Sequence, residues 1–332
     1  MRTLKRLVLF VIAAFMCFAA WFYHHINTDI QLPVTPYEFS VEQGDTLRII
    51  TQQLADAKIL PNKWSFILLA RLLGHESALK AGDYILNRQF SQIALLEYLI
   101  EGDVKQNEIR FIEGWTFLQL RNALNKHPAI QHDTVNLSNQ DILQLIGASE
   151  TAPEGLFFPD TYYFIKNNSD IEILRRAYIR MQGQLAAAWS QRDESIPLNT
   201  MYDALVLASI VEKETGMESD RAEIAGVFVN RLRLGMRLQT DPTVIYGIGE
   251  TFDGNLRRKD LQTDHAYNTY TRAGLPPTPI AMPGLPSILA AVNPAQTDAL
   301  YFVAKGNGES KFSTNLADHN RAVAKYQKRR TQ

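Results

Sequence analysis

Cysteine is almost absent from this sequence, and so is any surplus of positive charge. Cys17 is the only cysteine in 332 residues, so no disulfide framework can form within the chain, and cysteine usage leaves the compartment undecided. Lys and Arg total 34 against 35 Asp and Glu, a net charge of −1. An extended nucleic-acid-binding surface needs a basic surplus, and only the C-terminal "KYQKRR" is locally basic, as the solvated end of a helix often is. We therefore expect no nucleic-acid partner.

The motifs of several reaction classes are also missing. None of the seven histidines lies in H-E-x-x-H or another metal-binding spacing, and there is no G-x-S-x-G elbow, P-loop or complete dinucleotide fingerprint. Ser77 and Lys80 match the S-x-x-K pattern of acyl-transferring penicillin-binding proteins, but no K-T-G or S-D-N partner occurs. The sequence therefore predicts neither a metal nor an organic cofactor.

The longest apolar run lies at the N-terminus. Basic residues at positions 2, 5 and 6 precede Leu7–Tyr23, a run of 17 uncharged and mostly apolar residues, and a membrane-spanning helix needs roughly 17 to 25. The aromatic residues at its end are typical of a membrane interface. Because a basic flank stays in the cytoplasm, we predict a cytoplasmic tail over 1–6, a single-pass transmembrane anchor over 7–25, and export of the remainder.

A cleaved signal peptide is the alternative interpretation of this run. Its apolar core is usually shorter, about 7 to 15 residues, and a small-x-small cleavage site follows it. Here Ala19 and Ala20 are followed by the bulky Trp21 and Phe22. We therefore favour an uncleaved anchor.

The rest of the chain divides into two regions. With 46% hydrophobic and 21% charged residues the composition is that of a globular protein, and the length indicates about two domains. Residues 26–37 contain two prolines and little periodicity, which predicts a stalk. A small unit over 38–106 shows a strand, two helices, a second strand and a third helix, and a larger mixed region over 107–332 follows. The predicted fold class is α+β.

The stretch "LVLASIVEKET", residues 205–215, places two carboxylates at the end of an apolar helix. At roughly 100° per residue, Glu214 falls in the middle of the arc formed by Leu207, Ile210 and Val211, whereas Glu212 points to the other side. A carboxyl group among apolar side chains is desolvated, which raises its pKa and allows it to hold a proton for donation. Glu214 is thus a candidate general acid, and the alternative is an exposed last helical turn.

Further polar residues follow on the next segments. Glu218 completes a T-x-x-E pattern, which predicts a capping box at the start of the next helix. Arg231, beside Asn230, lies on the apolar face of that helix and requires a carboxylate from the protein or a ligand. Asp241 before Pro242 forms a good helix start with Asp as N-cap, and a substrate role is left open.

The stretch "YNTYTRAGLPPTPIAMPGLP", residues 267–286, is a proline-rich loop that follows two tyrosines, Asn268 and Thr269. A rigid loop with amide, hydroxyl and aromatic side chains suits a sugar groove, where hydroxyls need hydrogen bonds and ring faces stack. The same composition also suits a structural loop, so both interpretations stand.

Five separated motifs together resemble one family. "EGLFFPDTYYF", "ASIVEKET", "FVNRLRLGMRLQTDPTVIYG", "YNTYTRAGLPPTPIAMPG" and "YFVAKGNGESKFSTNLADHN" occur in the order seen in membrane-anchored endolytic murein transglycosylases, the YceG-like or MltG family. The resemblance covers residues 38–325 and implies a LysM-like subdomain, a peptidoglycan-binding type of module, over 38–106. It also implies a YceG-like catalytic domain of mixed α/β structure over 107–332.

The resemblance implies an exported lyase. Such an enzyme cuts the β-1,4 bond between N-acetylmuramic acid and N-acetylglucosamine within nascent glycan strands, leaves 1,6-anhydro ends and terminates strand elongation. It implies the bacterial inner membrane as location, a periplasmic catalytic domain, and peptidoglycan synthases as partners. The family's catalytic glutamate, the second Glu of E-K-E-T, corresponds to Glu214. The expected substrate-binding residues are Glu154, Asn230, Arg231, Gln239, Asp241, Asn268, Thr269 and Tyr270.

Two loop positions depart from the family's pattern. Thr278 stands where Gly is usual, and Met282 stands where Asn is frequent. Both departures concern contacts in the groove rather than the reaction class.

One carboxyl group is sufficient for this reaction. The sugar's own C6 hydroxyl is a tethered nucleophile, so it replaces the second carboxylate that ordinary glycosidases use. Two alternatives remain open. A hydrolytic muramidase would take a second carboxylate from Glu154, Glu218 or Asp241, and a non-catalytic peptidoglycan-binding scaffold would need none.

Overall fold

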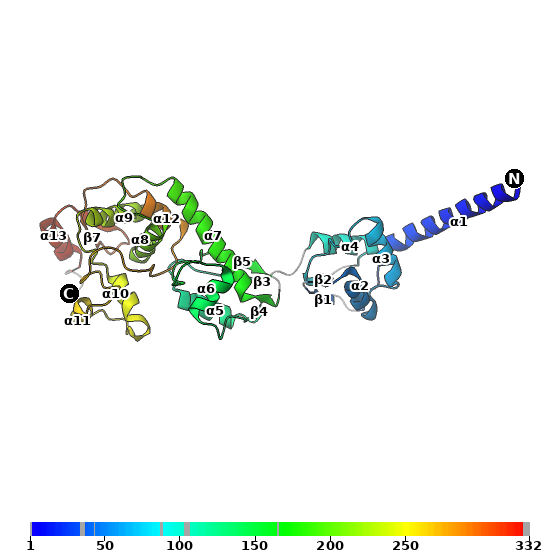
Figure 1. Ribbon diagram of the computed structural model, residues 1–332, viewed down its shortest axis with the longest axis horizontal. Helices are drawn as coiled ribbons and strands as arrows, with labels where there is room; N and C mark the ends of the chain where they lie inside the picture. The colour runs from blue at the N-terminus through cyan, green and yellow to red at the C-terminus, as the bar shows by residue number, and fades with distance from the viewer. Residues whose placement is uncertain are drawn as a thin grey trace. The chain divides into compact units, whose positions relative to one another are not determined.

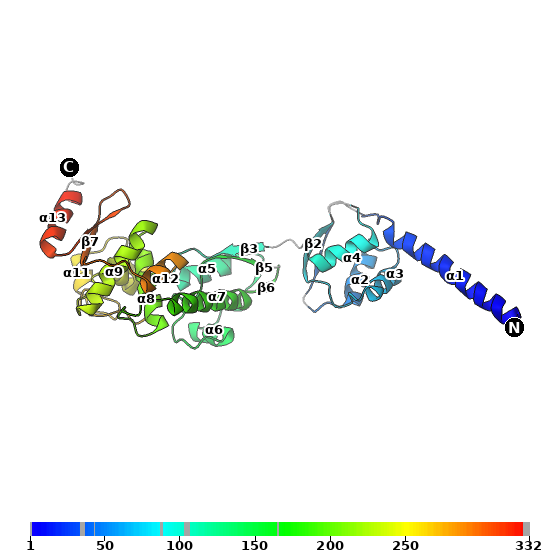
Figure 2. The ribbon, with the colours of Figure 1, turned by 90° about the horizontal axis from the view of Figure 1, so that it is seen from above.

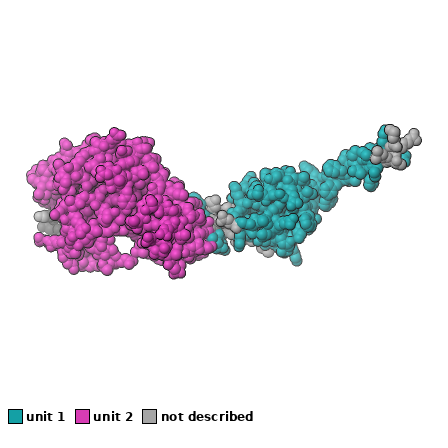
Figure 3. Space-filling view, viewed as in Figure 1, with its two compact units in different colours: residues 1–107, 163–167 teal, residues 108–162, 168–332 magenta. Residues whose placement is uncertain are grey.

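The computed structural model describes residues 2–33, 37–42, 44–86, 89–102, 107–164 and 166–327. The chain separates into two compact units, drawn in different colours in Figure 3. Unit 1 comprises residues 1–107 and 163–167, and unit 2 comprises 108–162 and 168–332. Both contain helices and short strands, which confirms the predicted mixture of helix and sheet.

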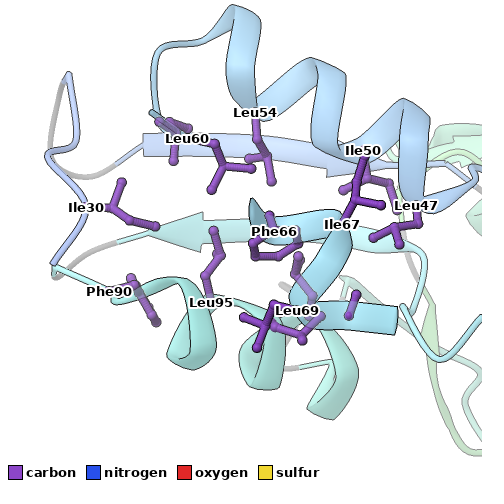
Figure 4. Packing of buried hydrophobic residues seen from close by; sticks show 14 of the residues in the cluster. Ile30, Leu47, Ile50, Leu54, Leu60, Phe66, Ile67, Leu69, Phe90 and Leu95 are labelled. Atoms are coloured by element: carbon purple, nitrogen blue, oxygen red, sulfur yellow. The ribbon is translucent and has the colours of Figure 1, made fainter. Parts of the chain in front are cut away.

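Unit 1 packs helices against a two-stranded sheet (Figure 1). Strands β1 and β2 pair antiparallel, with Phe39 opposite Tyr84. Figure 4 shows apolar side chains of the helices pointing toward one another and toward these strands. The elements are α1 (Arg2–Asn27), β1 (Tyr37–Val41), α2 (Leu47–Asp56), α3 (Lys63–Leu72), β2 (Gly82–Leu86) and α4 (Gln92–Glu101).

Local sequence signals set the ends of the helices in unit 1. The Thr46 side chain accepts a hydrogen bond from the backbone at the start of α2, and the Asn62 side chain does the same for α3. Gly102 ends α4 with a left-handed φ of 70°, which glycine adopts without steric penalty. These helices lie where the periodicity predicts them.

The predicted stalk over 26–37 is wrong in its first part. Helix α1 continues to Asn27, and Ile26 and Ile30 are buried in the core of unit 1. The Ile30 amide also donates to the Phe90 carbonyl at 2.7 Å. Residues 34–36 of the predicted stalk lie outside the described residues. Two isoleucines four positions apart, close to a proline, give no recognisable periodicity, so the sequence did not reveal their burial.

Helix α1 is the part of the chain suited to a membrane. Among the described residues, Lys5–Asn27 is the single helix that is long and apolar enough to cross a bilayer. Its large apolar side chains are mostly exposed in the structure, as expected of a helix whose surroundings are lipid.

The remainder of the chain carries further helices and three pairs of short strands: β3 with β5, β4 with β6 in parallel, and β7 with β8 in antiparallel orientation. The elements are β3 (Asn107–Arg110), α5 (Phe117–Lys126), β4 (Ile130–Gln131), α6 (Asn139–Ile146), β5 (Thr161–Phe164), β6 (Asn168–Ser169), α7 (Asp170–Ser190), α8 (Met201–Glu214), α9 (Glu218–Arg233), α10 (Asp241–Ile248), η1 (Gly249–Thr251), α11 (Arg258–Gln262), α12 (Leu285–Val292), β7 (Tyr301–Ala304), β8 (Ser310–Ser313) and α13 (Leu316–Tyr326).

Helix α8 is central to unit 2. Helices α7, α9, α10 and α12 all pack against it, and every residue from Ala204 to Val211 is buried. Leu205 and Ser209, which share the side of the helix on which Glu212 lies, are buried as well, and α12 packs against this helix. A helix that is apolar all round belongs in a core. The carboxylates at its end are therefore the first polar side chains after a run of buried ones.

Candidate active site

Glu214 ends helix α8 at the wall of a cavity of about 530 Å³ in unit 2. Its Oε1 accepts a hydrogen bond from the hydroxyl of Thr240. Burial is the main reason that the pKa of Glu214 is raised to about 7. The nearby Asp241 carboxylate acts in the same direction, whereas the Thr240 hydroxyl and the Arg231 guanidinium lower the pKa. Near neutral pH this carboxyl group can therefore both hold and release a proton.

A buried threonine network holds Thr240 in place. The Thr240 amide donates to the Thr269 hydroxyl oxygen at 3.1 Å, and the Thr243 hydroxyl donates to the Thr240 carbonyl at 2.8 Å. The Gln239 amide donates to the Thr269 carbonyl at 3.2 Å, and Gln239 has a φ of 48°, which is uncommon for a residue other than glycine. Gln239 lines the cavity, whereas the buried Thr269 acts on the site through Thr240.

Arg231 lines the same cavity and is itself buried. Its Nε donates to the Leu300 carbonyl at 2.7 Å and one terminal nitrogen donates to the Leu238 carbonyl at 2.6 Å. The guanidinium lies 5.2 Å from the centre of the Tyr301 ring. Backbone carbonyls and an aromatic face thus hold the cation, and its positive charge lowers the pKa of Glu214 through space.

Asp241 and Tyr270 are also brought to the cavity. The Tyr270 hydroxyl donates to the Asp241 carboxylate at 2.6 Å. The prediction of Asp241 as N-cap is wrong, because α10 begins at Asp241 itself and Thr240 is the residue that precedes the helix. The Asp241 side chain is consequently directed to Tyr270 rather than to the helix backbone.

Glu154 has a different environment. It is only 6% exposed, its Oε1 accepts from the Phe117 amide at 2.9 Å, and its Oε2 accepts from the Tyr246 hydroxyl at 3.1 Å. Burial raises its pKa to about 7. Among the described residues it lines a second, smaller cavity of about 330 Å³ with Phe117, Tyr246, Tyr267 and others, rather than the cavity at Glu214. Figure 3 shows an opening in unit 2, near α5 and α10 of Figure 1.

Two predicted substrate-binding amides have backbone partners instead. The Asn230 side chain donates to the carbonyls of Thr297 at 2.7 Å and Ala299 at 3.1 Å. Asn268 is fully buried, donates to three backbone carbonyls and accepts from the Tyr270 amide at 2.8 Å. The structure therefore gives both residues a role in shaping the loops around the cavity.

Glu212, two residues before Glu214, is a structural carboxylate. Its Oε2 accepts from the Gly284 amide at 3.0 Å and from the Ser287 hydroxyl at 2.7 Å. Both donors lie at the start of α12, where the helix dipole favours negative charge. Of the two carboxylates in "EKE", one thus fixes α12 to α8 and the other faces the cavity.

The capping box predicted for Glu218 is absent. Helix α9 begins at Glu218, and the preceding Met217 makes no side-chain cap. The Thr215 hydroxyl instead accepts from the Met217 amide at 2.9 Å. Glu218 is exposed and lines a separate surface hollow with Arg221.

The two departures in the proline-rich loop also have defined places. Met282 is buried, and its amide donates to the Trp115 carbonyl at 2.8 Å. The Thr278 hydroxyl lies 2.8 Å from the Tyr267 hydroxyl oxygen and lines the smaller cavity beside Glu154. Met282 is therefore a packing residue, and Thr278 alone of the two borders open space.

Sequence reasoning missed the contribution of the C-terminal segment. Tyr301 on β7 and His319 on α13 line the Glu214 cavity, and their rings stack at 5.2 Å. The His319 Nδ1 is buried and has no hydrogen-bond partner among the described residues. Burial, and to a smaller extent the Arg231 charge, lowers the pKa of this imidazole. The motif "YFVAKGNGESKFSTNLADHN" contains both residues, so this motif was the sequence feature that could have identified them as part of the site. No group of side chains placed to hold a metal ion occurs within the described ranges.

Comparisons with known proteins match this chain over most of its length. The model of the YceG-like family matches residues 39–325. A Bacillus subtilis (strain 168) protein named endolytic murein transglycosylase is 31% identical over 309 residues, which cover 88% of this chain and 85% of that protein. A Streptococcus pneumoniae serotype 2 protein of the same name is 27% identical over 86% of this chain but only 57% of its own length. A crystal structure of a yceG-like protein from Listeria monocytogenes is 28% identical with a TM-score of 0.55, over 86% of this chain and 98% of that one.

Proposed function

This chain belongs to the YceG-like family, and from that membership we propose that it is an endolytic peptidoglycan lytic transglycosylase. It cleaves the β-1,4 bond between N-acetylmuramic acid and N-acetylglucosamine within nascent glycan strands and leaves 1,6-anhydro-N-acetylmuramic acid ends, so that strand elongation stops. One observation carries the assignment of the site. Glu214, with a pKa raised to about 7, lies at the wall of a cavity of about 530 Å³, and Thr240 holds one of its oxygens.

In the proposed mechanism Glu214 acts first as acid and then as base. The protonated carboxyl group donates its proton to the glycosidic oxygen while the bond from C1 to that oxygen breaks, so the leaving sugar gains a hydroxyl. The carboxylate then removes the proton from the C6 hydroxyl, whose oxygen bonds to C1. No water is consumed, and Glu214 ends the cycle protonated.

The other residues of the cavity have supporting roles in this proposal. The Asp241 carboxylate stabilises the positive charge that develops on the sugar ring in the transition state. Gln239, Tyr270 and Arg231 border the same space and position the sugar units. Thr269 and Asn268 hold the backbone of these groups rather than the substrate.

A hydrolytic muramidase is the second candidate, and Asp241 is the observation that favours it. Asp241 lines the same cavity as Glu214, so it is placed to activate a water molecule. Glu154 and Glu218, the other carboxylates considered for this role, line different cavities. Asp241 is therefore the carboxylate on which the hydrolytic alternative depends.

We also propose the location and the module type. Helix α1 anchors the chain once in the inner membrane, with the basic N-terminus in the cytoplasm and unit 2 in the periplasm. Residues 38–106, which include the paired strands β1 and β2, are the proposed LysM-like peptidoglycan-binding module. Peptidoglycan synthases are the proposed protein partners.

Product analysis tests the reaction class. The full chain in phospholipid nanodiscs is incubated with uncrosslinked glycan strands, and the new ends are identified by mass spectrometry. We expect ends one water lighter than reducing muramic acid, lost in Glu214→Gln and kept in Glu212→Gln, the matched carboxylate two residues away. Reducing ends would establish the muramidase and direct attention to Asp241. Strand binding without cleavage would support a scaffold and overturn both enzymatic proposals.

A further inference from the structure

Helix α3 of unit 1 carries an apolar face that no described residue of this unit covers. Trp64 is 65% exposed, Leu68 37% and Leu72 68%, and their spacing of four residues places them on one side of the helix. Arg71 lies on the same side by helical geometry. We call these four residues the α3 face. The opposite side of α3 packs into the core through residues such as Phe66 and Leu69, as Figure 4 shows.

The α3 face lies next to the membrane-spanning helix. Helix α1 packs against α3 and α4, and Figures 1 and 2 both show α3 at the end of unit 1 from which α1 leaves. Phe22 of α1 packs against the core of unit 1, and Ile26 is buried in it. The core of this unit therefore begins within the last turns of α1, with no free linker between them.

The distance along α1 places unit 1 at the bilayer surface. The aromatic residues Trp21 and Tyr23, both exposed, are of the type that marks the membrane interface. Ile26 lies three positions after Tyr23, which is about 5 Å along a helix. The headgroup layer is itself several Å thick on each side of the hydrocarbon, and interfacial helices bury their apolar face about 5 to 10 Å into this layer. An element in contact with the end of α1 thus lies at headgroup depth.

The chemistry of the α3 face fits a lipid surface. Tryptophan is enriched at membrane interfaces, and leucines beside it supply apolar area. The Lys63 ammonium lies 5.8 Å from the centre of the Trp64 ring, and Arg71 extends from the same side. Long basic side chains can keep their charge at the headgroups while their stems cover apolar surface. The Arg71 guanidinium already pairs with the Glu76 carboxylate, so Lys63 is the cation of this face that anionic headgroups complement.

We propose that the α3 face lies in the headgroup region of the same bilayer that α1 spans, so that unit 1 rests on the membrane instead of standing clear of it. The proposal depends on α1 being a membrane anchor, and it does not depend on the reaction that unit 2 carries out. Its occupant is the lipid surface, and contact of the face with another protein is an outcome that the test distinguishes.

Spin-label depth measurements test the proposal with the full chain in vesicles of phosphatidylethanolamine and phosphatidylglycerol. The native Cys17 serves as reporter of the anchor, and in a Cys17→Ser background Leu68→Cys reports the α3 face. Gln53→Cys, on the exposed side of α2, is the matched control. Collisions with lipid-soluble oxygen and with a water-soluble nickel chelate are compared at each site.

We expect Cys17 and Leu68→Cys to favour oxygen and Gln53→Cys to favour the nickel chelate. A reading at Leu68→Cys equal to that at Gln53→Cys, with Cys17 still in lipid, would overturn the inference while leaving the anchor intact. A reading at Cys17 typical of water would overturn the anchor itself.

A second measurement avoids substitutions. A trace of photoactivatable phosphatidylcholine in the same vesicles is expected to label peptides of α3 in the native chain, and replacing the phosphatidylglycerol by phosphatidylcholine is expected to weaken this labelling because Lys63 loses its anionic partner. Labelling confined to α1 would contradict the proposal.

Discussion

Glu154 and Glu214 are two carboxyl groups of unit 2 with the same shifted pKa and different surroundings. Burial raises the pKa of each to about 7. Both oxygens of Glu154 have fixed donors, Phe117 and Tyr246, whereas among the described residues Glu214 has one, Thr240, and it borders the larger cavity. A raised pKa thus identifies a desolvated carboxyl group. Whether that group can react depends on two further features, an oxygen without a fixed partner and open space beside it.

The largest expected effect separates the two residues by activity. Glu214→Gln removes the proton donor, so strand cleavage should fall by roughly 10²- to 10⁴-fold. Glu154→Gln keeps an acceptor for Phe117 and a hydrogen-bonding group for Tyr246, so cleavage should fall less than about tenfold. Initial rates of anhydro-end formation by the full chain in nanodiscs measure both. Equal losses in the two variants would make Glu154 a catalytic group and erase the distinction.

The next effect concerns the free energy of unfolding, for which the larger loss is expected at Glu154 rather than at Glu214. Glu154→Ala leaves the Phe117 amide and the Tyr246 hydroxyl without their buried partner, which should lower the free energy of unfolding of unit 2 by about 2 to 4 kcal/mol. Glu214→Ala should change it little or raise it, because residues at reactive sites are seldom optimised for stability.

Urea unfolding in detergent micelles measures this difference. Replacing Trp21 and Trp64 by Phe leaves Trp115 and Trp189 as fluorescent reporters within unit 2. A Glu154→Ala chain as stable as the parent would show that its two hydrogen bonds are dispensable.

A third effect concerns stability against pH. The pKa of Glu154 in the folded chain, about 7, lies above its ordinary value of 4.5. Its contribution is therefore fully present below pH 4.5 and is lost as the pH rises through 7, by up to about 3 kcal/mol. Unfolding of the parent should become easier between about pH 5 and pH 8, and Glu154→Gln should remove about half of this slope, because the raised pKa of Glu214 contributes in the same way. An unchanged slope in Glu154→Gln would assign it to other groups.

The smallest expected effect concerns the pH profile of activity. Cleavage requires protonated Glu214, so kcat/KM should decline as the pH rises through about 7. Asp241→Asn removes a negative charge that raises the Glu214 pKa, so the decline should move to lower pH. Asp253→Asn, which breaks an exposed ion pair with Arg257, is the control and should leave the profile in place. A shift toward higher pH in Asp241→Asn would contradict the assigned interaction.

The sequence was informative where the signals are local. The order of strands and helices in unit 1 was predictable because their ends depend on neighbouring residues, such as Asn62 at the start of α3 and Gly102 at the end of α4. The choice of Glu214 over Glu212 came from helical geometry, and its catalytic role remains a prediction.

Contacts between residues far apart in the sequence could not be predicted from it. Thr240, which holds Glu214, is separated from it by 26 positions, and no local pattern connects them. Asn268 was predicted to bind sugar because an amide in a loop can hydrogen-bond hydroxyl groups, yet its side-chain amide donates to three backbone carbonyls. A polar side chain in a loop satisfies whichever partners the folded chain presents, and the sequence does not reveal these in advance.

The burial of Ile26 and Ile30 makes the membrane helix part of the folding of unit 1. Proteolytic shedding after Ile26 would not release an intact domain, because it would take away a core side chain whose loss costs about 2 to 5 kcal/mol. During synthesis the core cannot be completed until the end of α1 has reached its place. Unit 1 therefore has its complete core only when the C-terminal turn of α1 is in place.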